Sequence, residues 1–168
     1  PNGLMDVVCG YGPDPSSPDI VQIAYGSGWA LPCASPIYIK AHGYPNDPDE
    51  LIKHTGIVFH SPMRKTITTL TKNGETKTLA WDHVIQFYSA QAAKNATLIG
   101  SGIHSGIPTL HSYRELIVGG LKPVLPGWCS PPLELYIFVR PESLKLRRVR
   151  TFIQWYCETM RRLHSDVD

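Results

Sequence analysis

The stretch Ala34-Ser35-Pro36-Ile37-Tyr38 decides where a predicted strand gives way to the first predicted helix of this chain. A serine hydroxyl accepts a hydrogen bond from a backbone N–H in the first helical turn, and proline suits the first helical position because that N–H would have no partner. The apolar run over 29–34 predicts a strand before this serine, and a short helix over 37–41 follows it. Gly43 ends the predicted helix.

The same arrangement occurs again at Ser89, which stands between a predicted strand over 84–88 and a predicted helix over 90–99. Other predicted elements are strands at 5–9, 20–25, 57–59, 103–107, 121–125 and 133–139, and helices at 109–118, at 144–162 and after Asp47. Alternation of strands and helices favours a mostly parallel sheet with helices on its faces. We therefore expect an α/β fold.

Asn73-Gly74 lies between two threonine-rich arms in the segment 66–81. These two residues tolerate the positive φ angles that a tight hairpin turn requires. The arms carry few large apolar side chains, so the sequence predicts an exposed hairpin.

The predicted C-terminal helix carries an apolar stripe and a basic face. The stripe consists of side chains at helical spacing: Leu146, Val149, Ile153, Tyr156 and Met160. This periodicity is typical of a helix surface that faces a core, and not of a cofactor site. The basic face consists of arginines, which we interpret as solvated: Arg147, Arg148, Arg150, Arg161 and Arg162.

The composition is that of a globular protein. The chain has 168 residues, of which 42% are hydrophobic and 18% are charged. This length suffices for one domain with a core, or for two small lobes that share one sheet system. The formal net charge of +2 is too small to indicate a phosphate-backbone partner. The apolar runs, such as 135–139, are too short to cross a bilayer, so we expect no membrane partner.

The four cysteines stand at positions 9, 33, 129 and 157 and form no CxxC pair. This spacing argues against a zinc site and against thioredoxin-like chemistry. We expect reduced thiols of a cytoplasmic protein, because a disulfide framework belongs to oxidising compartments.

Motifs of the common enzyme classes are absent from the sequence. Gly100-Ser101-Gly102 with Gly106 departs from the dinucleotide fingerprint in spacing, and it follows a predicted helix where a strand is required. No serine stands in G-x-S-x-G, and no H-E-x-x-H occurs. His104 and His111 lack metal-ligand spacing. We therefore assign no catalytic residue, no metal ligand and no cofactor.

Ser35 and Ser89 are the polar residues of most interest, because each is predicted to stand where a strand ends and a helix begins. In open α/β sheets, ligands bind beyond the carboxyl ends of strands, and helix N-termini favour anionic groups. A hydroxyl in this position bonds either to its own helix or to a ligand. Both interpretations stay open for both serines.

Several motifs of this chain resemble the effector-sensing domain of LysR-type transcription regulators. The matching segments and positions, in chain order, are Asp6-Val7-Val8, 34–38, 42–45, 48–51, His54, 96–103, Pro108, Leu116, Gly119, Leu121, Val124, Leu125, Pro126 and Trp128. The chain departs from the family pattern around Cys9-Gly10, where an arginine is usual, and between Gly100 and Pro108, where one extra residue stands. The shared order of the motifs makes the resemblance specific.

This resemblance implies a type 2 periplasmic-binding-protein-like fold, with two Rossmann-like lobes around a cleft. Lobe one is then expected over 1–33 and 138–168, incomplete at its start, and lobe two over 34–137. The winged helix-turn-helix with which this family reads DNA has no counterpart in the sequence. The chain is therefore expected to be a fragment in which no residue reads DNA.

The resemblance also implies a small anionic effector in the cleft. The effector-binding residues expected from it are Ser35, Phe59, His60, Tyr88, Ser89 and Ile107. The two serines are expected to donate hydrogen bonds to the effector, and the other four residues to shape the pocket.

Family members form homodimers or tetramers and bind DNA through the missing domain. Family dimers pair the helix equivalent to 89–99 with a helix of the partner that this chain lacks, so the resemblance implies impaired dimerisation of the fragment. Two other classes stay open: a solute-binding protein of a transport system, which shares the fold, and an enzyme on the same scaffold.

Overall fold

The computed structural model describes residues 5–13, 18–61 and 66–165, and the chain divides into two compact units. Unit 1 comprises 1–28 and 133–168, and unit 2 comprises 29–132. The lobe boundaries expected from the sequence, after 33 and after 137, lie further along the chain. The units divide at the starts of strands β3 (Ala30–Ala34) and β10 (Leu133–Val139), so that each strand belongs wholly to one unit.

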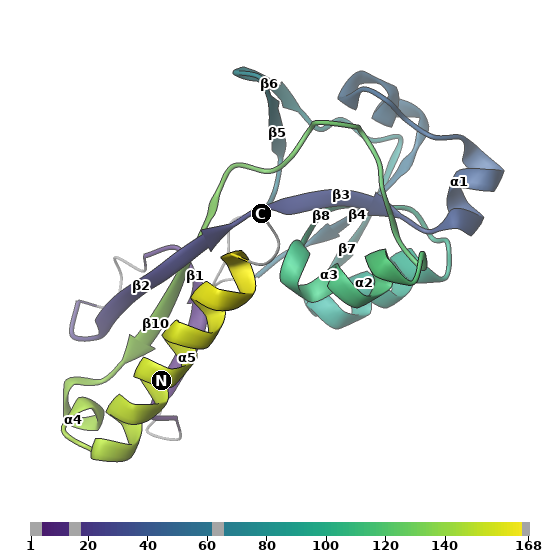
Figure 1. The fold of residues 1–168 in the computed structure, drawn as a ribbon. Coiled ribbons are helices and arrows are strands. Elements are labelled where there is room, and N and C mark those ends of the chain that lie inside the picture. Colours follow the sequence, from purple (N-terminus) through teal and green to yellow (C-terminus); the bar gives the residue numbers. More distant parts are fainter. Residues whose placement is uncertain (1–4, 14–17, 62–65, 166–168) are drawn as a thin grey trace. The chain divides into compact units, whose positions relative to one another are not determined.

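Unit 1 is a small antiparallel sheet covered by one long helix, α5 (Arg147–Ser165) (Figure 1). The strands are β1 (Val7–Tyr11), β2 (Val21–Gly28) and β10, and β10 pairs antiparallel with both of the others. The short helix α4 (Pro141–Leu144) precedes α5.

The apolar stripe of α5 faces the core of unit 1, as its helical spacing predicts. Val149 and Ile153 are buried against Ile137 of the sheet, and Tyr156 and Met160 pack against the same cluster. Leu146 is the exception, at 36% exposed, because it precedes the first turn of α5.

Unit 2 is built on a mixed sheet of five strands in the order β7-β4-β8-β3-β9. Besides β3, its strands are β4 (Thr55–Phe59), β7 (His83–Phe87), β8 (Ile103–Pro108) and β9 (Lys122–Pro123). β4 runs parallel to β7 and β8, whereas β3 runs antiparallel to β8 and β9. The expected mostly parallel sheet is therefore found only in β7-β4-β8.

The connections between strands explain this mixed pattern. Helix α2 (Ala90–Leu98) returns the chain from the end of β7 to the edge where β7 began, and β8 therefore starts there and runs parallel. The segment between β3 and β4 holds only the short α1 (Pro36–His42) and the 3-10 helix η1 (Pro48–Lys53). It leaves the chain at the edge where β3 ended, so β4 starts there and runs in the opposite direction.

Three helices of unit 2, namely α1, η1 and α2, begin at the capping residues that the sequence predicts. The Ser35 hydroxyl accepts from the Tyr38 N–H, and Asp47 accepts from the Asp49 N–H at the start of η1. Ser89 caps α2. A further helix, α3 (Thr109–Ile117), lies beside α2, and the Lys94–Glu115 ion pair joins the two at 2.8 Å (Figure 1).

The predicted hairpin exists as β5 (Thr69–Lys72) and β6 (Glu75–Thr78). Its turn residues Asn73 and Gly74 have φ angles of 51° and 85°, which confirms the reason for the prediction. The hairpin is less exposed than expected, because Leu70 is fully buried.

An ion-pair cluster holds the second arm of the hairpin to the start of η1. Lys77 lies 2.6 Å from carboxylate oxygens of both Asp47 and Asp49, and its ammonium stands over the ring of Trp128. The hydrogen bond from Lys77 lowers the pKa of Asp47.

Buried polar contacts explain why a tyrosine stands at position 38 and a histidine at position 54. The Tyr38 hydroxyl lies 3.3 Å from His54 Nδ1 and accepts from the Thr55 N–H at 3.0 Å. Tyr38 and His54 are 3% and 6% exposed. This network ties α1 to the first residue of β4, because an unsatisfied buried polar group would cost about 1–3 kcal/mol.

We predict that Gly102→Ala destabilises unit 2 by about 1–3 kcal/mol. A Cβ at this position would stand 2.6 Å from the Thr55 carbonyl oxygen, and backbone cannot move away cheaply. The measurement is urea unfolding followed by tryptophan fluorescence in a Trp155→Phe background, since the other three tryptophans lie in unit 2. Gly120→Ala is the matched control, because its nearest neighbour would be 3.5 Å away. Equal stability of the two variants would contradict the prediction.

We also predict that acid destabilises unit 2 through His54. Burial lowers the pKa of His54 below 6.5, so the unfolded chain binds the proton more readily than the folded one. The stabilising contribution of His54 is complete above pH 6.5 and is lost as pH falls through the folded-state pKa.

The free energy of unfolding, measured between pH 7.5 and 5, should therefore fall less steeply in His54→Gln than in the wild type. His83→Gln is the control, because the His83 side chain is 76% exposed. Parallel pH curves for the wild type and His54→Gln would refute the assignment.

Candidate ligand-binding site

The parallel strands of unit 2 end at one edge of the sheet, which we call the carboxyl edge. Phe59 ends β4 opposite Phe87, which ends β7, and β8 runs in the same direction and ends at Pro108. The expected site residues that lie in or directly after these strand ends are Phe59, His60, Tyr88, Ser89 and Ile107. The structure therefore brings five of the six expected residues to one edge.

His60 is held at this edge by three contacts. Its backbone N–H donates to the Phe87 carbonyl oxygen at 2.8 Å, which continues the β4–β7 pairing by one residue. Its ring meets the Tyr88 ring edge to face, with centroids 5.6 Å apart. Its Nδ1 lies 3.1 Å from the Thr66 hydroxyl oxygen. The imidazole is therefore exposed and at the same time fixed in position.

Ser89 combines a capping role with access to solvent. Its hydroxyl oxygen accepts from the Ala92 N–H at 3.3 Å, and the residue is exposed. A hydroxyl that accepts in this way still has its proton to donate. Cap and ligand contact are therefore compatible at Ser89.

A second helix starts at the same edge. The N-cap residue of α3 is Pro108, and no side chain caps this helix. The N-termini of α2 and α3 each carry partial positive charge from their aligned peptide dipoles, which favours an anion nearby by about 0.3–1 kcal/mol each. The sequence predicts this second N-terminus too, because it places a strand over 103–107 and a helix over 109–118.

The apolar residues of the carboxyl edge differ in exposure. Ile107 is 3% exposed and packs with Cys33 and Leu121 in the core of unit 2. Phe59 is half-buried, and Tyr88 is 75% exposed. The edge thus offers an aromatic surface above a buried aliphatic layer.

Ser35 lies at the opposite edge of the sheet. Because β3 is antiparallel to β8, Ala30 pairs with Pro108 at the carboxyl edge and the strand ends at the other one. Ser35 is 1% exposed, its hydroxyl caps α1, and a Cβ on Gly100 would lie 3.7 Å from it. The structure thus separates Ser35 from the other five expected residues and gives its hydroxyl a capping role.

Thr66 is a polar neighbour of the candidate site that the sequence did not indicate. It lies six residues after His60 and outside the named strands, and no local pattern connects the two.

Side chains that could bind a metal or react as nucleophiles are dispersed. Within the described ranges, no three His, Cys, Asp or Glu side chains form a group that could hold a metal ion. All four cysteines are free thiols, and burial raises the pKa of Cys33 to about 12, which leaves it a poor nucleophile. His104, a candidate ligand by residue type, accepts at Nδ1 from the Gly106 N–H.

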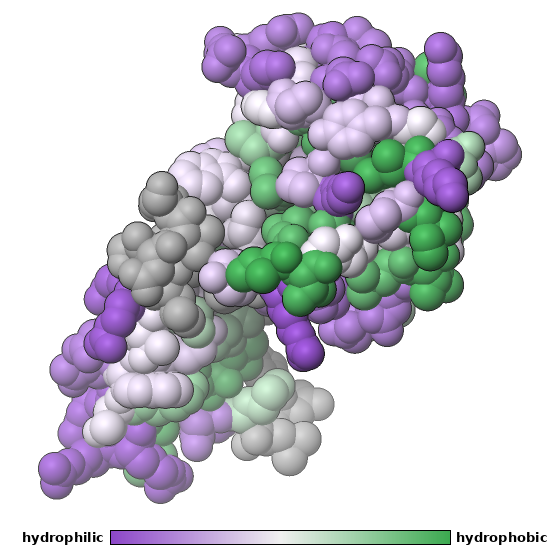
Figure 2. Space-filling view, turned by 45° about the vertical axis from the view of Figure 1, so that its right-hand side comes forward, coloured by the Kyte–Doolittle hydropathy of each residue, from purple (hydrophilic) through white to green (hydrophobic). Residues whose placement is uncertain are grey.

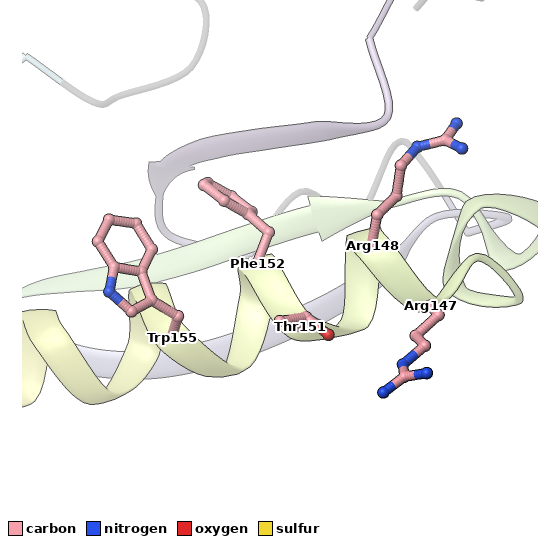
Figure 3. A pocket seen from close by; sticks show the side chains of 5 residues that line it. All are labelled: Arg147, Arg148, Thr151, Phe152 and Trp155. Carbon is pink, nitrogen blue, oxygen red and sulfur yellow. The ribbon is translucent and has the colours of Figure 1, made fainter.

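A pocket of about 540 Å³ lies on α5 of unit 1 (Figure 3). Its lining consists of Arg147, Arg148, Thr151, Phe152 and Trp155. Figure 3 shows the two aromatic rings on one side of the helix and the two arginines pointing apart. Because all five side chains come from one helix, this hollow is a helix face, and not the concave, many-sided site that small ligands usually occupy.

Exposed apolar side chains also occur on the helices of unit 2, where Figure 2 shows hydrophobic surface interrupted by polar side chains. They include Ile37, Ile99, Ile117 and Val118, each at least 65% exposed. Over the described part of the chain, no helix has both the length and the hydropathy to cross a membrane.

Comparison with known proteins places the chain in a family. The model of the LysR substrate binding domain matches residues 2–161. The Escherichia coli (strain K12) "Uncharacterized HTH-type transcriptional regulator YhjC" is 33% identical over 133 residues, which cover 77% of this chain and 44% of that protein. The chain thus spans less than half the length of this relative.

Solved structures show the same fold. The full-length Vibrio cholerae virulence activator AphB, a member of the LTTR protein family, has a TM-score of 0.73 at 26% identity, over 92% of this chain and 51% of that one. The regulatory domain of CrgA, a LysR-type transcriptional regulator from Neisseria meningitidis, has a TM-score of 0.74 at 18% identity, over 92% of this chain and 74% of that domain.

These regulatory domains have the type 2 periplasmic-binding-protein-like fold that the sequence motifs implied, so that prediction is confirmed. The matched family is one of transcription regulators and not of enzymes. The chain belongs to the LysR substrate-binding domain family.

Proposed function

We propose that this chain senses a small anionic effector at the carboxyl edge of unit 2 and passes that signal to a DNA-binding domain of the longer protein. The observation that carries the proposal is the exposed hydroxyl of Ser89 at the N-terminus of α2, where β4, β7 and β8 end. The family match supports the same function, because it is to a substrate-binding domain of regulators.

The polar groups at this edge favour an anion. Ser89 and His60 each offer a donor, and a hydrogen bond to a charged group contributes about 1.5–3 kcal/mol. Association itself costs about 4 kcal/mol or more in lost translational and rotational freedom. Two hydrogen bonds and two helix N-termini therefore give weak affinity at best, and the aromatic surface of Phe59 and Tyr88 has to supply the rest by apolar contact.

Regulation follows from differential affinity. An effector shifts the protein towards one conformation only by binding that conformation more tightly, and the same free energy couples effector binding to DNA binding. In this proposal DNA is bound by a winged helix-turn-helix outside the chain, and the regulator acts in the cytoplasm without a cofactor.

Assembly is the second part of the proposal. The regulator forms a homodimer or tetramer, and unit 2 contributes α2 and the adjacent strand β7. Val84 and Ile85 of β7 are 50% and 40% exposed, which leaves apolar surface for a partner at this sheet edge.

A solute-binding protein of a transport system is the alternative with the same fold. It is not favoured, because the relatives and solved structures that match are transcription regulators. An enzyme is the third class, and it is not favoured because the matched family is one of transcription regulators.

A thermal-shift screen of the 168-residue chain against small carboxylates tests the proposal, with the corresponding amides as neutral controls. We expect at least one carboxylate to raise Tm and its amide to have no effect. Ser89→Ala should then weaken binding of that carboxylate about tenfold to a hundredfold, because one hydrogen bond to the anion is lost.

Ser35→Ala is the matched control for the position of the site. It removes a buried cap at the other sheet edge, so it should lower stability by about 1 kcal/mol and leave the carboxylate affinity unchanged. An unchanged affinity in Ser89→Ala would refute the site, and a weakened affinity in Ser35→Ala alone would move it to the opposite edge.

A further inference from the structure

The His60 imidazole has one nitrogen in use and one available. Nδ1 lies 3.1 Å from the Thr66 hydroxyl oxygen, and no partner of Nε2 lies within the described residues. The Tyr88 ring packs edge to face against the imidazole at an interplanar angle of 78°. The ring is thus oriented by two neighbours that come from different parts of the chain.

The Thr66 hydroxyl lies 3.1 Å from Nδ1 of the imidazole, and a threonine hydroxyl both donates and accepts. In a neutral ring, a bond donated by Thr66 to Nδ1 leaves the ring proton on Nε2, whereas a bond accepted from Nδ1–H leaves Nε2 as an acceptor. In a protonated ring both nitrogens carry protons. With Thr66 as the donor to the neutral ring, His60 presents an N–H donor at Nε2 in both states.

We propose that Thr66 donates to Nδ1 of the neutral His60 ring and is thereby a positioning residue that holds His60 as a hydrogen-bond donor, so that His60 selects a carboxylate on the effector. This inference rests on the proposed function and adds a residue and a ligand class to it. The same geometry rejects an ammonium group, because a donor facing Nε2–H would be left without an acceptor.

Ser89 makes the choice of a carboxylate stronger. It follows Tyr88 directly and adds a hydroxyl donor at the N-terminus of α2. A carboxylate has two oxygens, so it accepts from two donors at once, and its negative charge strengthens both bonds. A neutral carbonyl group has one oxygen and carries no such charge.

The first test measures the tautomer of His60 by ¹⁵N NMR of the 168-residue chain at alkaline pH, where imidazoles are neutral. Loss of a signal in His60→Gln assigns the resonance. We expect the Nε2–H tautomer in the wild type and in Thr66→Ser, which keeps the hydroxyl. Thr66→Val has the same shape without the hydroxyl, and we expect it to populate both tautomers.

His83 is the internal control for this measurement. Its Nδ1 also has an oxygen partner, Asp82 at 2.7 Å, but it lies at the start of β7 and away from Thr66. Its signals should be the same in all variants. An unchanged His60 tautomer in Thr66→Val would overturn the positioning role.

The second test titrates the chain with acetate and, separately, with acetamide. We expect acetate to shift the His60 Nε2 resonance saturably and acetamide to leave it in place. Thr66→Val should weaken acetate binding about fivefold, and Thr66→Ser should restore it. A His60 resonance that moves equally with both probes, or with neither, would overturn the inference.

The two proposals fail separately. If the carboxylate screen finds a ligand that depends on Ser89 while Thr66→Val keeps both tautomer and affinity, only the positioning inference is wrong. If no carboxylate binds, the proposed function is wrong even where the tautomer is as expected.

Discussion

The burial of β8 is the constraint on which unit 2 depends. Its residues from Ile103 to Ile107 are all buried, so its backbone groups have to be satisfied by strands on both sides. β4 satisfies one side in parallel and β3 satisfies the other in antiparallel orientation. The start of β4 also lies so close to the residue before β8 that this residue has to be glycine. A Cβ at Gly102 would meet the Thr55 carbonyl.

This change of direction across β8 decides which side chains share an edge. The parallel strands deliver His60, Ser89 and Ile107 to one edge, each at or directly after a strand end. The antiparallel β3 delivers Ser35 to the other edge. Two serines with the same local signature therefore have different environments, one exposed and one almost completely buried.

The polar contacts of unit 2 also fall into a buried group and an exposed group. Inside, the Tyr38 hydroxyl bonds to His54 and accepts from the Thr55 N–H, and all of these groups are buried or part-buried. At the carboxyl edge, the hydroxyl of Ser89 and the imidazole of His60 each have one bond within the protein and one hydrogen-bonding group left over. A site oriented in this way loses little freedom when a ligand binds, which is the advantage of preorganisation.

The sequence by itself determined the local structure of this protein. Serine caps at 35 and 89, the Asn73-Gly74 turn, and the helical spacing of Val149 and Ile153 each follow from interactions within a few residues, and the structure confirms them. The ordered motifs also led to the family and hence to the fold.

Tertiary structure alone decided strand direction and the neighbours of each site residue. The direction of a strand depends on whether the connection before it crosses back over the sheet. The sequence predicts the short helices α1 and η1 between β3 and β4, but it does not show whether they carry the chain back to the other edge. The contact between His60 and Thr66 joins two residues six apart in the chain, and no periodicity in the sequence indicates it. Burial of Ser35 has the same origin, because the packing of distant segments against a residue sets its exposure.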